Sequence, residues 1–108
     1  MEITNLLEDL KFGDNDPHAE PIHSDRKGRV ILFTLRAGQS IRAHNAPSSP
    51  FFVVVLKGQG GFTGRDGVER TCGPNTLLTF EAGEQHSIRA TEQLVFVGFL
   101  HGSPLAQK

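Results

Sequence analysis

Residue types that support disulfides, metal–thiolate clusters and phenol chemistry are nearly absent from this sequence. Its 108 residues include one cysteine, Cys72, one methionine, and no tryptophan or tyrosine. A single cysteine excludes an internal disulfide and an all-cysteine zinc site. Without tyrosine, the chain has no phenol for acid catalysis or radical chemistry. A lone thiol fits a reducing cytoplasm.

The sequence also lacks an excess of charge of one sign and any long apolar run. Eleven Lys and Arg residues oppose twelve Asp and Glu residues, for a formal net charge of −1. This balance provides no basic patch that would follow a phosphate backbone, so nucleic-acid binding is not expected. No apolar run approaches the ~20 residues that span a bilayer. Acidic residues near the N-terminus differ from the basic start of a signal peptide. We therefore expect a soluble, cytoplasmic protein with no membrane partner.

The length and composition predict one globular domain. Hydrophobic residues make up 37% of the chain and charged residues 21%, which is typical of a folded domain. Apolar residues within 1–12 recur at helical spacing, which predicts a short amphipathic turn there. Residues 12–21 are rich in Gly, Asp, Asn and Pro and are predicted to be a loop. We divide the chain into an N-terminal extension (1–19), a barrel (20–101) and a C-terminal tail (102–108).

The rest of the chain has the pattern of an all-β protein. The Asp66-Gly67 step is a strong hairpin signal, and residues 51–56 are apolar on both faces. Short strands at regular spacing, separated by Gly and Pro, indicate a sandwich, a jelly roll or a barrel, and periodicity alone does not choose among them. The predicted strands are 29–35, 40–44, 51–56, 61–63, 68–71, 76–80, 85–90 and 93–100.

Two segments carry a resemblance to a known family. The segment from Gly38 to Gly58 resembles the first cupin motif, with His44 in register between these glycines. Ala46 stands where the motif has its second His, and Phe51 where it has its Glu. The segment from Thr79 to Ile88 resembles the second cupin motif. There Gly83 and His86 are in register, Glu81 replaces a Pro, and Ala90 replaces an Asn.

The resemblance to cupins implies a fold and some properties that accompany it. The implied fold is all-β, a double-stranded β-helix (jelly-roll) cupin barrel, here with a short N-terminal extension. The motif histidines, His44 and His86, would point inward at one end. Cupins commonly hold a divalent metal there through three His and one Glu, and they commonly form dimers. We therefore expect a homodimer, which the strands with two apolar faces also favour.

A candidate ligand pocket follows from the two motifs and from strand alternation. Alternation places Arg42, His44 and Ala46 on one face of their strand, and His86 with Ile88 on one face of theirs. Such a lining is mostly apolar with a few polar groups, as in sites for small molecules. The candidate residues are His44, His86, Phe51, Ala46, Arg42 and Ile88.

A metal site is the sharper hypothesis for the same residues. His44 and His86 supply two imidazoles, whereas catalytic zinc and iron sites usually have three protein ligands. Ala46 and Phe51 cannot coordinate, so a third ligand would come from His101, His23 or Gln85. The cofactor is then a divalent ion (Zn, Fe, Ni or Mn), and otherwise none.

Two functions from different classes remain open at this stage. The first is a small cupin that binds a small molecule in an apolar pocket centred on two histidines, without redox chemistry. The alternative is a metal-dependent cupin enzyme, of dioxygenase or isomerase type, with a reduced set of His ligands. The loss of two ligand positions favours binding over metal catalysis. A metal-free acid–base role for the two histidines is also compatible with the sequence.

Overall fold

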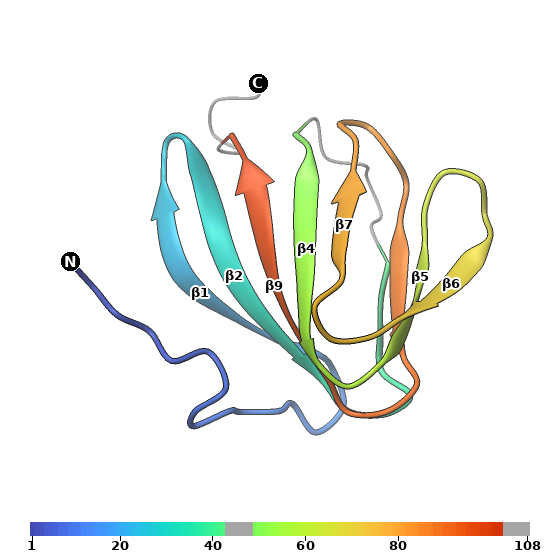
Figure 1. Cartoon of the computed structure of the whole chain (residues 1–108), viewed down its shortest axis with the longest axis horizontal. Coiled ribbons are helices and arrows are strands. Elements are labelled where there is room, and N and C mark those ends of the chain that lie inside the picture. Colours follow the sequence, from blue (N-terminus) through green and yellow to red (C-terminus); the bar gives the residue numbers. More distant parts are fainter. Residues whose placement is uncertain (43–48, 103–108) are drawn as a thin grey trace.

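A computed structural model of the chain describes residues 1–42 and 49–102 and consists of strands, turns and loops (Figure 1). The four-residue strands β5 and β6 form the hairpin predicted at Asp66-Gly67, and Gly67 has a φ of 74°. The strands are β1 (His18–Asp25), β2 (Gly28–Leu35), β3 (Ser40–Arg42), β4 (Phe51–Lys57), β5 (Gly60–Thr63), β6 (Glu69–Cys72), β7 (Leu77–Phe80), β8 (Ser87–Ala90) and β9 (Leu94–His101).

The strands form two antiparallel sheets. The five-stranded sheet has the order β1-β2-β9-β4-β7, and the four-stranded sheet has the order β3-β8-β5-β6. Without the edge strand β1, the remaining eight strands alternate between the sheets except at the β5–β6 hairpin, which is the arrangement of a jelly roll. The predicted all-β, jelly-roll fold is therefore confirmed.

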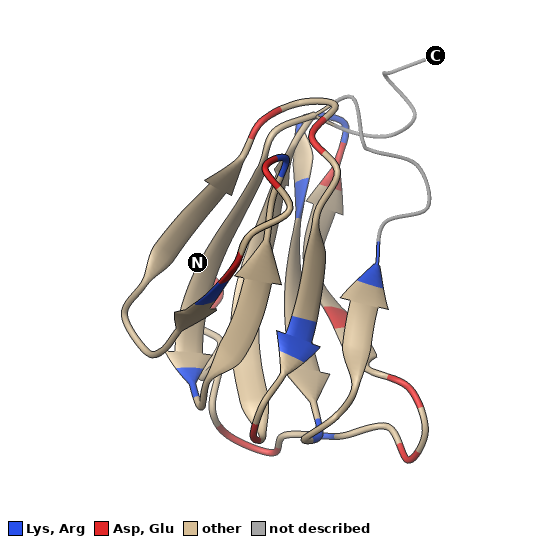
Figure 2. Cartoon of the chain, turned by 90° about the vertical axis from the view of Figure 1, so that its right-hand side faces the viewer, with Lys and Arg blue, Asp and Glu red and all other residues tan. Residues whose placement is uncertain are grey.

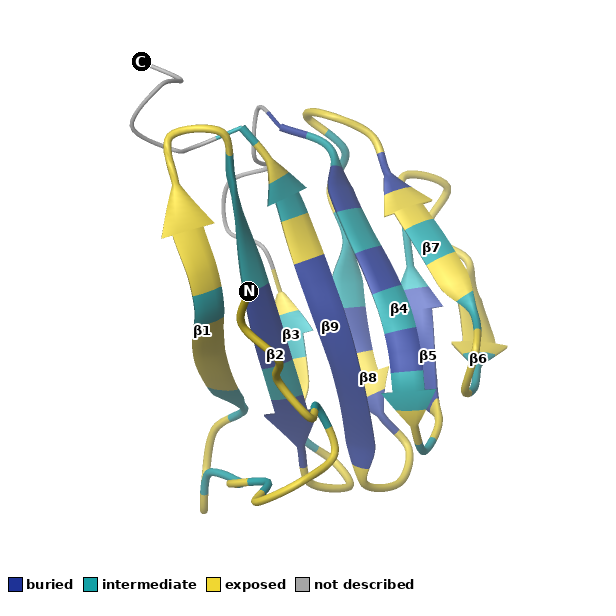
Figure 3. Cartoon of the chain, turned by 60° about the vertical axis from the view of Figure 1, so that its left-hand side comes forward, coloured by how far each residue is buried: buried dark blue, intermediate teal, exposed yellow. Residues whose placement is uncertain are grey.

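The core lies between the sheets because alternate residues of each strand point inward. In β4, Phe51, Val53 and Val55 are buried, whereas the intervening residues are only partly covered. In β9, Leu94 and Phe96 are fully buried on the inner face. Figure 3 shows β9 as the most buried strand of its sheet and β1 as an exposed edge. Two well-packed sheet faces thus account for the apolar pattern of the sequence.

The N-terminal region contains a turn, as predicted, but the turn does not extend into a helix. It is closed by a hydrogen bond from the Glu8 N–H to the Asn5 carbonyl and is followed by Asp9, which has a φ of 53°. Four apolar residues in so short a segment do not offset the cost of helix nucleation. The segment is instead tied to β2, where the Thr34 hydroxyl donates a hydrogen bond to the Lys11 carbonyl.

Strand β1 starts inside the segment that was predicted to be a loop. Pro21 lies within this strand, and the register of β1 against β2 shifts between Pro21 and His23. Proline is tolerated there because β1 is an edge strand, and a bulge absorbs the missing donor. The composition of residues 12–21 therefore predicted a loop, although the last part of this segment belongs to the edge strand β1.

Charged residues lie mainly at strand ends and in turns, and acidic and basic positions are mixed in the view of Figure 2. Only a few ion pairs link them, such as the pair between Arg89 and Glu69 at 2.7 Å. The described residues include no helix that could cross a membrane.

Candidate functional site

His86 is the polar centre of an aromatic cluster at the end of the barrel where β4 begins and β7 ends. Its ring lies 4.6 Å from the Phe80 ring and 5.4 Å from the Phe51 ring, with interplanar angles of 24° and 27°. Phe51 and Phe80 are themselves stacked at 6.3 Å. Three nearly parallel rings thus meet here, and two of them belong to the buried core.

The environment of His86 favours its neutral form. Burial lowers the pKa of the imidazole, and the carbonyl oxygen of Glu84, 3.4 Å from Nδ1, opposes this only in part. When Nδ1 carries the proton, it donates toward that carbonyl, and Nε2 keeps its lone pair. A neutral imidazole of this kind can accept a proton, accept a hydrogen bond or coordinate a metal ion.

An open cavity of about 180 Å³ lies beside His86. It is bordered by residues from three segments that are adjacent in the four-stranded sheet. Polar side chains predominate at this rim, whereas the aromatic cluster lies behind His86. The lining residues are Arg42, Thr63, Gly64, Gln85, His86 and Ser87.

Arg42 borders this cavity from outside the barrel. The short strand β3 turns Ile41 against the core cluster, opposite Ile88, and leaves Arg42 exposed opposite Ser87. Arg42 is therefore on the outward face of its strand, where it borders the cavity at its rim. Alternation on β8 is as expected, because Ile88 is 1% exposed and Arg89 is exposed.

The remaining candidate residues are placed as follows. His44 and Ala46 lie outside the described residues. His101 is an exposed residue at the end of β9, on the face opposite Leu100, and His23 on β1 contacts Asp25 at 2.9 Å. Within residues 1–42 and 49–102, no group of three or more His, Cys, Asp or Glu side chains is placed to hold a metal ion.

Two residues that shape the site, Phe80 and Glu84, were not among the candidates named from the sequence. Phe80 forms the closest aromatic contact of His86, and its inward position could have been read from alternation along β7. Glu84 accepts hydrogen bonds from the backbone N–H groups of Arg65 and Glu81, at 2.8 and 2.9 Å. These bonds hold the pKa of Glu84 below its usual value. Nothing in the linear sequence pairs Glu84 with the β5–β6 turn.

Comparisons with known proteins agree with this architecture. Residues 31–98 match the Cupin domain family. An RmlC-like cupin protein from Desulfovibrio desulfuricans superposes with a TM-score of 0.84 at 24% identity, covering 94% of this chain and 96% of that one. The protein TT1209 from Thermus thermophilus gives 0.87 at 19% identity, covering 96% and 100%.

A third similar structure has a provisional functional name. It comes from Ralstonia eutropha JMP134 and is provisionally named a mannose-6-phosphate isomerase. It gives a TM-score of 0.81 at 17% identity, covering 95% of this chain and 100% of that one.

A comparison with curated proteins finds no match. The match to the family covers more than half of the chain, and the chain belongs to the cupin domain family.

Proposed function

We propose that this cupin binds a small molecule at the end of the barrel marked by His86, and that it senses or sequesters that ligand. The observation that carries the proposal is the half-buried, neutral imidazole of His86 stacked on Phe80 and Phe51. A desolvated polar group against an apolar wall is the usual composition of a small-molecule site. A ligand with an apolar body and one hydrogen-bonding group fits this arrangement.

Arg42 supports a preference for anionic or hydroxyl-rich ligands. Its exposed guanidinium borders the cavity that His86 borders, and an arginine can hold a carboxylate through two hydrogen bonds. Small carboxylates and sugars are therefore the first ligands to test. The site needs no redox group for this function, because binding rests on packing and hydrogen bonding.

We expect a bound carboxylate or sugar to stabilise the protein through His86. At a ligand concentration of 100 times Kd, Tm should rise by roughly 10 °C, because such binding contributes about 2.7 kcal/mol. A thermal-shift screen identifies the ligand, and the shift should be lost in His86→Ala. The matched control is His23→Ala, which removes an exposed histidine from the edge strand β1. A hit that persists in His86→Ala would place the ligand elsewhere.

The alternative is a metal-dependent isomerase or oxygenase with a reduced ligand set. The Nε2 of His86, which makes no hydrogen bond to the described residues, and the name of the Ralstonia protein favour it. Under our proposal, the purified protein holds far less than one Zn, Fe, Ni or Mn ion per chain when it is analysed by elemental mass spectrometry. Stoichiometric metal that disappears in a His44→Ala/His86→Ala double variant would instead establish the enzyme alternative.

We also propose a homodimer formed through the outer face of the five-stranded sheet. Phe99 and Leu77 are 37% and 65% exposed on this face, beside the partly covered Phe52 and Val54. Phe96, by contrast, is fully buried inside the barrel. A continuous apolar sheet face of this kind is typical of a protein interface.

Light scattering tests the homodimer. The wild type should have twice the chain mass, and Phe52→Lys should be monomeric because a charge in the apolar face opposes association. The matched control is Thr71→Lys, an exposed position on the four-stranded sheet, which should remain dimeric. A wild type that is monomeric at high protein concentration would contradict the proposal.

A further inference from the structure

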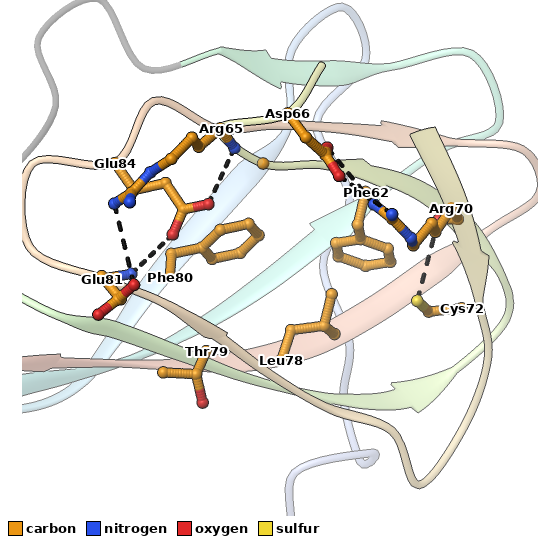
Figure 4. Close-up of a pocket in the computed structure, with 11 residues that line it drawn as sticks. Phe62, Arg65, Asp66, Arg70, Cys72, Leu78, Thr79, Phe80, Glu81 and Glu84 are labelled. Atoms are coloured by element: carbon orange, nitrogen blue, oxygen red, sulfur yellow. Dashed lines mark hydrogen bonds and ion pairs between the residues drawn. The ribbon is translucent and has the colours of Figure 1, made fainter. Parts of the chain in front are cut away.

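A second and larger cavity, of about 420 Å³, opens on the side of the barrel (Figure 4). It lies between β6 and β7, which are the edge strands of the two sheets. Among the described strands, no pairing closes the barrel at this point, so side chains of the core come to the surface. His86 does not line this cavity, although four of its lining residues, Thr79, Phe80, Glu81 and Glu84, come from the second motif segment.

The floor of the side cavity is apolar and partly aromatic. Phe62 and Phe80 contribute rings that are 3% and 5% exposed, and Leu78 packs against the same core cluster. Figure 4 shows these three side chains near one another, with Glu84, Arg65 and Asp66 above them in the view. A floor of two rings and a leucine suits a planar apolar group, which stacks on aromatic side chains.

Charged residues at the rim are held in defined positions. The Arg70 guanidinium is occupied, because it donates to Asp66 at 3.0 Å and to the Val68 carbonyl at 3.3 Å. The Glu84 carboxylate is also occupied, because two backbone N–H groups bind it. Its bond to the Arg65 N–H ties the β5–β6 turn to the β7–β8 turn, so one end of the cavity is preorganised.

Arg65 is the rim group that is available to a ligand. Its guanidinium approaches Glu81 at 3.9 Å, and within the described residues its side chain makes no hydrogen bond. Its side chain is 64% exposed. A guanidinium with unused donors above an aromatic floor can bind a carboxylate bidentately while the attached ring packs below.

We propose that this side cavity is a second ligand site, which binds a planar aromatic carboxylate. The ring lies against Phe62, Leu78 and Phe80, and the carboxylate pairs with Arg65. The volume is within the range of small-molecule sites. Its lining differs from that of the cavity beside His86 except at Gly64, which borders both, and the Phe80 ring of its floor stacks on His86.

Titration with 2-naphthoate, followed by amide chemical shifts, tests this site. The shifts should centre on Phe62, Leu78 and Phe80, and Arg65→Ala should raise Kd roughly tenfold, as expected for the loss of a charge-assisted contact. Arg26→Ala, in the β1–β2 turn, is the matched control and should leave Kd unchanged. The neutral analogue 2-naphthalenemethanol should bind the wild type and Arg65→Ala equally weakly.

Cys72 provides an independent readout because it lines the cavity and is the only cysteine of the chain. Bound naphthoate should slow modification of Cys72 by a thiol reagent in the wild type, and much less so in Arg65→Ala at the same concentration. Equal affinities of the acid and the alcohol would overturn the proposal. Shifts confined to Gln85, His86 and Ser87 would also overturn it, since they would place naphthoate beside His86.

Discussion

Replacing Gly58 with alanine is expected to destabilise the protein by about 2–5 kcal/mol, a large part of the stability of a small domain. Gly58 has a φ of 80°, and an added Cβ would overlap the Gln93 carbonyl oxygen and lie 2.8 Å from its carbon. Left-handed backbone costs an ordinary residue about 1–2 kcal/mol, and forced packing against a fixed backbone adds about 1–3 kcal/mol. Urea denaturation followed by circular dichroism measures the loss.

Gly67→Ala is the matched control for this prediction. Gly67 has a φ of 74°, but nothing lies within 4 Å of the position of an added Cβ. It should therefore lose only about 1 kcal/mol, from backbone conformation alone. Equal losses in the two variants would show that close contact with the β8–β9 turn is not what requires glycine at position 58. Unequal losses would explain in physical terms why this cupin motif ends in glycine.

The central strands were predictable because their patterns reflect burial. Residues 51–56 and 93–100 are apolar on both faces, and they correspond to β4 and β9, neighbours in the middle of the five-stranded sheet. The Asp66-Gly67 step identified the β5–β6 hairpin, because its backbone requirement is local. Signals that depend on a few adjacent residues, or on burial from both sides, therefore survive in the sequence.

The sequence was least informative where contacts between distant segments determine the local structure. Strand β1 forms because its edge position tolerates Pro21, and the composition of the segment cannot show which edge of the sheet is free. The face to which Arg42 belongs could not be read from the sequence, because alternation gives the period of a strand but not its phase. Pairing of Ile41 with Ile88 fixes that phase, and this contact joins residues far apart in sequence.

The candidate site was predictable only in part for the same reason. The cupin motifs identified His86 and Phe51 as candidate residues, and their rings lie 5.4 Å apart. The closer contact with Phe80 needs the pairing of β4 with β7. The side cavity needs two edge strands from different sheets, which no spacing of residues encodes.

Phe51→Ala is expected to cost about 3–4 kcal/mol and to raise the pKa of His86 toward its ordinary value. Phe51 is 7% exposed and packs against Phe33, Phe80 and His86. Its ring also lies over β9, where an added Cβ on Gly98 would be 2.6 Å from it. Truncation leaves a cavity in the core and admits water to the imidazole, which removes the main cause of its lowered pKa.

The pH dependence of stability separates these two effects. Because burial lowers the pKa of His86, the unfolded chain binds this proton more readily, and wild-type stability should fall as pH drops below the ordinary value of 6.5. Phe51→Ala should lose less stability over the same interval. Val68→Ala, at an exposed position in the β5–β6 turn, is the control and should cost no more than about 0.5 kcal/mol and keep the wild-type slope. An unchanged slope in Phe51→Ala would show that Phe51 does not desolvate His86, and the proposed pocket would lose its apolar wall.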